Sequence, residues 1–166
     1  MNLILTYSLP SDSKSQISNL KFMDTGLLHL HNILRWVILL LLIVTLLQAI
    51  AKSNGIRPTS LWLLIFSHIM LLIGLYQLIA GRYGTMKGLP EGVSLMKDTF
   101  YRFYWIEHPL MMVLAIIFIT VARGKAKLLN YKATAWLLFI ALVLILAAIP
   151  WPFREIVGRP WFPGVK

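Results

Sequence analysis

Four long apolar stretches divide the chain. They cover residues 26–51, 60–81, 101–122 and 133–153. A helix needs about 20 mostly apolar residues to cross the hydrocarbon core of a bilayer, and each stretch is long enough. Backbone N–H and C=O groups cannot stay unpaired in lipid, so each stretch is expected to be helical. Because the connections are short, the pattern predicts an all-α, integral membrane four-helix bundle in up-down order, spanning residues 26–153.

The segments that flank this domain are expected to lie outside the bilayer core. Residues 1–25 start with an apolar run, but no basic residue precedes it and Pro10 follows at once, so a signal peptide is not expected. Asp24 and Thr25 are suitable N-cap residues for the first helix. The end of the chain is rich in proline and tryptophan, and residues 154–166 are expected to form an interfacial tail.

Loop charge predicts an orientation for the bundle. The first and third connections are short and carry basic residues without any acid: Lys52, Arg57, Arg123, Lys125, Lys127 and Lys132. Short cytoplasmic loops are enriched in Lys and Arg. These two connections are therefore expected to be cytoplasmic, with both termini on the periplasmic side of a bacterial inner membrane.

The composition agrees with a membrane protein and narrows the chemistry. Hydrophobic residues make up 58% of the 166 residues and charged residues 13%, against about 45–50% and about 25% in soluble domains. The chain has no cysteine, which excludes disulfides, zinc–thiolate sites, iron–sulfur clusters and thiol catalysis. In so apolar a chain, the net charge of +10 indicates loops that touch anionic lipid rather than nucleic acid.

All four histidines lie in the predicted spans or at their start, and none lies in a loop. Ionisable residues inside a membrane are expensive and are a functional hypothesis by default. His31 and Arg35 are four residues apart and share a helix face, which should point inward because Arg35 is too deep for lipid. His29 lies on nearly the opposite side of the helix and is interpreted as interfacial. His68 lies well inside the second span.

His108 stands between Glu107 and Pro109 at the start of the third span. Pro109 removes the amide that would pair with the carbonyl of Trp105, so that carbonyl could accept a hydrogen bond from the imidazole. Glu107 has two open interpretations. It is either an interfacial acid neutralised by Arg102 or Arg35, or a residue that handles protons or quinone.

Imidazole side chains on facing helices are typical ligands of metals and haem iron. At 1.5 Å per residue, His31 and His108 lie at a similar depth, roughly 8 Å below the same surface, and His68 lies nearer the middle. Two of these three are expected to be axial ligands of one haem b. His31 with His108 fits best by depth, whereas His68 could pair with either or serve a second cofactor or a quinone. Arg35 or Arg102 could pair with the propionates, and Gly74 could leave room for the ring.

Three alternatives remain open at this stage. The three histidines could form a metal site, assisted by Met70, Met111 or Met112, although methionine in a span is more often plain packing. The protein could be a cofactor-free structural or assembly subunit, with its polar residues making interhelical hydrogen bonds. It could also be a small metal or proton transporter.

Four short sequence elements, taken together, resemble those of a known protein family. They are HNILRW in the first span, SHIMLLIGLYQ in the second, MKDTFYRFYWIEHPLMM leading into the third, and IPWPF at the end of the fourth. Together, over roughly residues 26–155, they resemble small bacterial four-helix membrane proteins labelled cytochrome b or b561-like. The resemblance implies b-type haem and a place in membrane electron transfer, with His31, His68, His108 and Arg35 as the functional residues.

We therefore expect a protein that binds one haem b and carries electrons in a respiratory or quinol-linked chain. Its partners would be membrane lipid, a quinone, and a redox protein or a larger membrane complex. Two haems are not expected, since the larger b561 proteins need four inward histidines and only three are well placed here.

Overall fold

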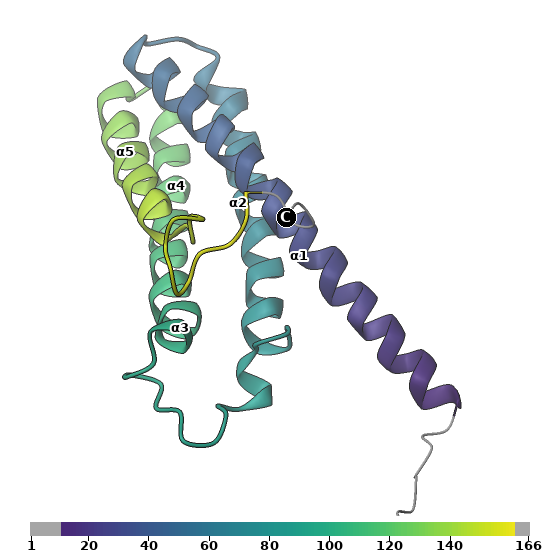
Figure 1. Cartoon of the computed structure of the whole chain (residues 1–166). Coiled ribbons are helices and arrows are strands. Elements are labelled where there is room, and N and C mark those ends of the chain that lie inside the picture. Colours follow the sequence, from purple (N-terminus) through teal and green to yellow (C-terminus); the bar gives the residue numbers. More distant parts are fainter. Residues whose placement is uncertain (1–10, 162–166) are drawn as a thin grey trace, which may run out of the picture.

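The computed structural model describes residues 11–161, with side chains from Phe22 onward (Figure 1). Every regular element in this part of the chain is helical. The long helices are α1 (Ser11–Ile50), α2 (Ile56–Ile79), α4 (His108–Lys127) and α5 (Tyr131–Ala148). Between α2 and α4 lie a short 3-10 helix η1 (Thr85–Lys87), the single turn α3 (Thr99–Arg102) and a π-helical turn η2 (Phe103–Glu107).

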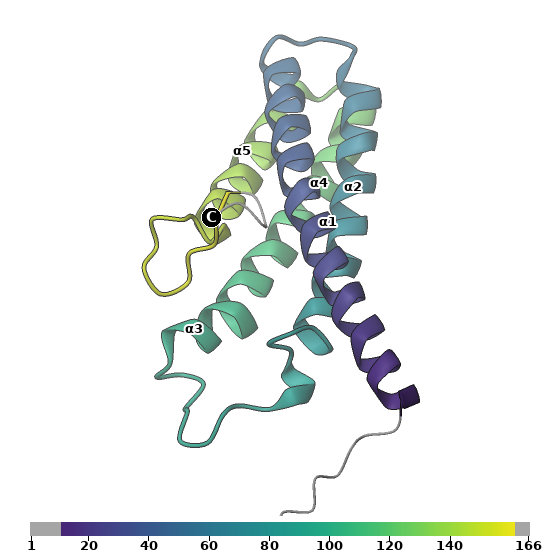
Figure 2. The same cartoon turned by 45° about the vertical axis from the view of Figure 1, so that its right-hand side comes forward.

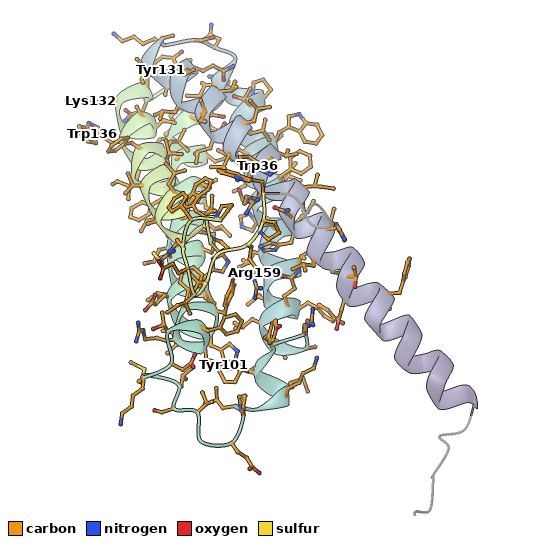
Figure 3. The ribbon with its side chains drawn as sticks, in the orientation of Figure 1. Trp36, Tyr101, Tyr131, Lys132, Trp136 and Arg159 are labelled. Carbon is orange, nitrogen blue, oxygen red and sulfur yellow. The ribbon has the colours of Figure 1, made fainter. Side chains whose placement is uncertain are left out.

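The predicted all-α bundle with four long apolar helices is confirmed. The segments long and apolar enough to span a membrane are Phe22–Ile50, Ile56–Ile79, Thr99–Lys127 and Tyr131–Ala148, which indicates a multi-pass membrane protein. α3, η2 and α4 follow one another without a break in the third of these. Large apolar side chains are exposed along the outside of the bundle, as with Leu72 (68% exposed) and Trp136 (61%), which extends outward from α5 in Figure 3. Lipid would cover such side chains.

The four helices form a ring in which α1 packs against α2 and α5, and α4 packs against the same two. α1 and α4 are thus diagonal neighbours across the bundle. In Figures 1 and 2 the helices are close together at the end with the connections 51–55 and 128–130, and they spread apart toward the other end. The longest connection, between α2 and α3, closes this wider end.

The core combines branched apolar side chains with alanines. Small residues allow helix backbones in a membrane to approach closely, and most of the buried alanines lie on α4 and α5. The fully buried members of the main core include Leu42, Leu63, Ala115, Ile119, Ala122, Leu138 and Ala141.

Two predicted helix boundaries are wrong. α1 does not begin after Asp24 but at Ser11, directly after Pro10, because nothing in the intervening residues breaks a helix. Asp24 lies within α1 and accepts a hydrogen bond from the hydroxyl of Tyr76 (3.3 Å) instead of capping the helix. The fourth helix ends at Ala148 rather than at residue 153. Ile149 is extended, as expected for a residue that precedes a proline, Pro150.

Candidate functional site

Two histidines from diagonal helices meet inside the bundle. The ring of His31 on α1 lies beside the ring of His108 at the start of α4, with centroids 6.4 Å apart and planes tilted by 51°. The backbones of α1 and α4 make at most a few close approaches. The two imidazoles therefore bridge a space that neither helix backbone fills. They are the two histidines that the sequence predicts to lie at a similar depth.

The local backbone explains how α4 presents His108. Pro109 has no N–H, and the turn before it widens into the π-helix η2, in which the N–H of His108 bonds to the carbonyl of Phe103. Single π-helical turns occur frequently at functional sites. The imidazole Nδ1 of His108 lies 2.8 Å from the carbonyl oxygen of Ala148 on α5. The prediction that it would bond to the freed carbonyl of Trp105 is wrong, because the ring points across to α5.

That hydrogen bond determines the tautomer of His108. A carbonyl oxygen can only accept, so Nδ1 carries the hydrogen and Nε2 keeps its lone pair. A metal-binding histidine is usually held in this way, with its second nitrogen bonded to a carbonyl or a carboxylate. His108 is therefore oriented as a ligand through Nε2.

Polar atoms without partners gather around His31. Among the residues that the structure describes, its buried Nδ1 has no hydrogen-bond partner, and the same holds for Oδ1 of Asn32, Nε of Arg35 and Nε2 of Gln77. A Cβ added to Gly74, one turn before Gln77, would lie 3.6 Å from Cε1 of His31, so the imidazole packs directly on this part of α2. Buried polar atoms are nearly always paired in proteins. The unpaired atoms on α1, at His31, Asn32 and Arg35, mark a place where a polar or charged group could bind.

The chain past α5 folds back over α1 beside this cluster. The carbonyl oxygen of Trp161 accepts hydrogen bonds from Nη2 of Arg35 (2.9 Å) and from Nδ2 of Asn32 (3.2 Å). The Trp161 ring stacks on Trp36 of α1 and also contacts Trp151. In Figure 3, Trp36 lies where the yellow C-terminal segment meets α1. The described part of the expected interfacial tail is therefore packed against the bundle.

A second set of contacts ties the same segment to η2. The hydroxyl of Tyr104 donates to the carbonyl of Val157 (2.7 Å) and accepts from Nε of Arg159 (2.9 Å). The guanidinium of Arg154 lies over the ring of Phe103, 4.7 Å from its centroid. Phe103 is fully buried and its ring contacts His108 at 5.9 Å. Residues 149–161 thus contact α1 next to His31 and η2 next to His108.

His68 is not part of this site. The prediction that it points inward is wrong: its side chain is exposed on the outside of α2, and its Nδ1 bonds to the carbonyl of Leu64 (2.8 Å). The neighbouring Ser67 takes the buried position in the helix turn. No group of three or more metal-ligating side chains occurs among the described residues, so the three-histidine metal site is not formed.

The remaining predicted residues have ordinary packing or pairing. Glu107 forms an ion pair with Arg102 (2.8 Å), at a position where both side chains are partly exposed. Met70 and Met112 pack against the apolar core. His29 is half-buried on α1. These contacts and positions explain where the four side chains lie, and none of them requires a bound ligand.

The histidine pair suits two axial ligands of one metal ion. With metal–nitrogen bonds of about 2 Å, two imidazoles on opposite sides of one ion have ring centroids roughly 6 Å apart, close to the observed separation. Imidazole is the ligand type of b-type haem iron. The unpaired Arg35 and Asn32 atoms lie beside the pair, where an anionic edge of such a group could bind.

Some residues of the site escape prediction from sequence. No sequence pattern assigned Asn32, Gln77, Tyr104 or Trp161 to it. Asn32 could have been found from its place next to His31, and Gln77 from its place one turn after Gly74. Trp161 could not, because nothing local shows that the chain end returns to α1. No protein family, curated protein or solved structure matches the chain.

Proposed function

We propose that this protein binds one haem b and carries electrons in a respiratory or quinol-linked chain of a bacterial inner membrane, with its termini on the periplasmic side. His31 and His108 are the residues that would hold its iron. The observation that carries the proposal is the close approach of their rings across diagonal helices, at the spacing expected for two imidazoles on one iron. His68 is left out because it faces the outside of the bundle.

Each residue of the site has a separate task. His108 is held through Nδ1 by Ala148, which keeps Nε2 free to bind iron. Arg35 carries a positive charge beside the pair, and its Nε has no partner. It is therefore suited to bind a propionate, and the neighbouring Asn32 adds a polar atom, Oδ1. A bound haem b supplies a one-electron Fe(III)/Fe(II) couple, whose potential depends on the ligands, on burial and on nearby hydrogen bonds.

Residues 149–161 cover part of this site. Trp161 and Trp151 cover it near α1, and Val157 is buried beneath Tyr104. This arrangement suits a carrier that passes electrons and binds no soluble substrate.

The test is a reduced-minus-oxidised absorption spectrum of the protein purified in mild detergent after expression with added haem precursor. We expect the wild type to show the sharp α band of a low-spin b-type haem. His31→Ala and His108→Ala should lose it. His68→Ala is the matched control and should keep the band, because His68 lies on the outer surface of α2.

Two results would overturn the proposal. A wild type that stays colourless after reconstitution with haem would make a cofactor-free subunit of a larger complex the better explanation. A band that survives in His31→Ala or His108→Ala but is lost in His68→Ala would contradict the ligand assignment.

A further inference from the structure

His68 lines an open groove on the outer surface, between α2 and α4. The groove has a volume of about 270 Å³ and faces the region that lipid would occupy. Its only other polar lining residue is Thr120 of α4. The remaining lining is aliphatic: Leu71, Val113, Ile116, Ile117 and Val121.

Hydrogen bonds within the helices determine what the two polar side chains can still bind. Nδ1 of His68 lies 2.8 Å from the carbonyl of Leu64, so Nδ1 carries the hydrogen and Nε2 keeps a lone pair. The hydroxyl of Thr120 donates to the carbonyl of Ile116 (2.8 Å), so its oxygen can only accept a further bond. The groove therefore offers two acceptors and no donor.

This pattern selects the kind of occupant. Lipid chains have no donor, and the backbone N–H groups of a neighbouring helix are already used within that helix. A suitable occupant is lipid-soluble, flat enough for a shallow aliphatic groove, and carries a hydroxyl group. An unpaired imidazole nitrogen in the hydrocarbon region is costly, so such a hydroxyl would gain a favourable bond there.

We propose that this groove binds the reduced, hydroxyl-bearing form of a membrane quinone, whose O–H donates to Nε2 of His68. The oxidised quinone has only carbonyl acceptors and would meet two more acceptors, so it should bind weakly. The choice of a hydroquinone among lipid-soluble phenols rests on the proposed electron-carrying function. The requirement for a hydroxyl donor rests on the groove alone.

The experiment uses protein with ¹⁵N-labelled histidine in lipid nanodiscs, kept reduced and without oxygen. The Nε2 resonance of His68 is assigned by its loss in His68→Gln. The probes are a decyl-substituted hydroquinone and its dimethyl ether, which has the same shape but no O–H. We expect the hydroquinone to shift the His68 resonance in a saturable way and the ether to leave it unchanged.

Matched variants separate binding in the groove from general partition into lipid. His68→Phe should weaken hydroquinone binding at least tenfold and Thr120→Val severalfold, both measured by equilibrium dialysis against empty nanodiscs. Phe139→Ala alters a second outer groove, lined by Leu46, Ile50, Lys132, Ala135, Trp136 and Phe139, and should leave binding unchanged.

Several outcomes would overturn the proposal. They are an equal shift with the ether, no shift with either probe, and a shifted resonance in ligand-free protein that disappears on dilution, which would identify a second copy as the partner. The measurement is repeated in His31→Ala, which should lack haem. Intact hydroquinone binding in this variant would show that the groove binds without haem. A wild type that binds hydroquinone but shows no haem band would contradict only the proposed function. A wild type with the haem band but without hydroquinone binding would contradict only the groove proposal.

Discussion

The imidazole of His108 donates a hydrogen bond through Nδ1 to the carbonyl oxygen of Ala148, forty residues further along the chain and 2.8 Å away. Ala148 is the last residue of α5, where helix carbonyls lack partners within the helix. One bond therefore completes the end of α5 and orients His108 toward His31. The structural role of His108 and its proposed ligand role can be separated, because they use different ring nitrogens.

Asparagine at position 108 should keep the first role and lose the second, since its amide nitrogen replaces Nδ1 but nothing replaces Nε2. We expect both His108→Asn and His108→Ala to lose the haem band. His108→Ala should also lower the free energy of unfolding by about 1–3 kcal/mol, the cost of a buried carbonyl without a donor. Thermal unfolding in detergent, without haem, measures this difference. Equal stability of the two variants would contradict the role given to the Ala148 bond.

Gly74 should tolerate a methyl group but not a large side chain. A Cβ at this position would be in ordinary contact with His31, at 3.6 Å from Cε1, so Gly74→Ala should bind haem like the wild type. Gly74→Leu should displace the imidazole and reduce haem content at least severalfold. Gly26→Leu is the control, because a Cβ at Gly26 has open space around it. Haem per protein, measured by the pyridine haemochrome spectrum, decides the result.

Tyr104 should hold residues 149–161 in place through its hydroxyl. Tyr104→Phe removes the bonds to Val157 and Arg159, each worth about 0.5–1.5 kcal/mol. We expect faster backbone hydrogen exchange in residues 150–161, measured by mass spectrometry. Tyr101→Phe is the control, because the hydroxyl of Tyr101 has no hydrogen bond to any described residue. Unchanged exchange in Tyr104→Phe would show that other contacts hold the segment.

The ion pair between Glu107 and Arg102 should contribute little. Both side chains are partly exposed, 40% and 33% respectively, and such pairs are worth about 0–1 kcal/mol. Glu107→Gln should therefore change the unfolding free energy by less than about 1 kcal/mol and leave the haem spectrum intact. A large change in the reduction kinetics of Glu107→Gln would instead support the proton or quinone role that the sequence left open.

The predicted orientation can be tested directly because the chain has no cysteine. Asn54→Cys lies in the connection between α1 and α2, and Glu91→Cys lies in the connection between α2 and α3; both positions are exposed. In intact bacterial spheroplasts, a membrane-impermeant maleimide should label Glu91→Cys and spare Asn54→Cys. The opposite labelling pattern would reverse the proposed topology.

Hydropathy along the chain was enough to establish four long apolar helices. Hydrophobic length and the need to pair every backbone group in lipid leave helices as the only form for these stretches, whatever their neighbours do. The sequence also indicated that His31 shares a face with Arg35, because helical spacing is local. Depth along the helices then placed His31 and His108 at one level.

Tertiary structure decided which polar groups meet. Small differences in helix rotation put Ser67 inside and His68 outside, and no sequence period shows this in a helix that is apolar on all sides. The return of residues 149–161 to α1, and the Ala148 bond, depend on how α4 and α5 pack. Contacts between residues far apart in the chain arise from that packing, whereas a sequence pattern reports only neighbours within a few turns.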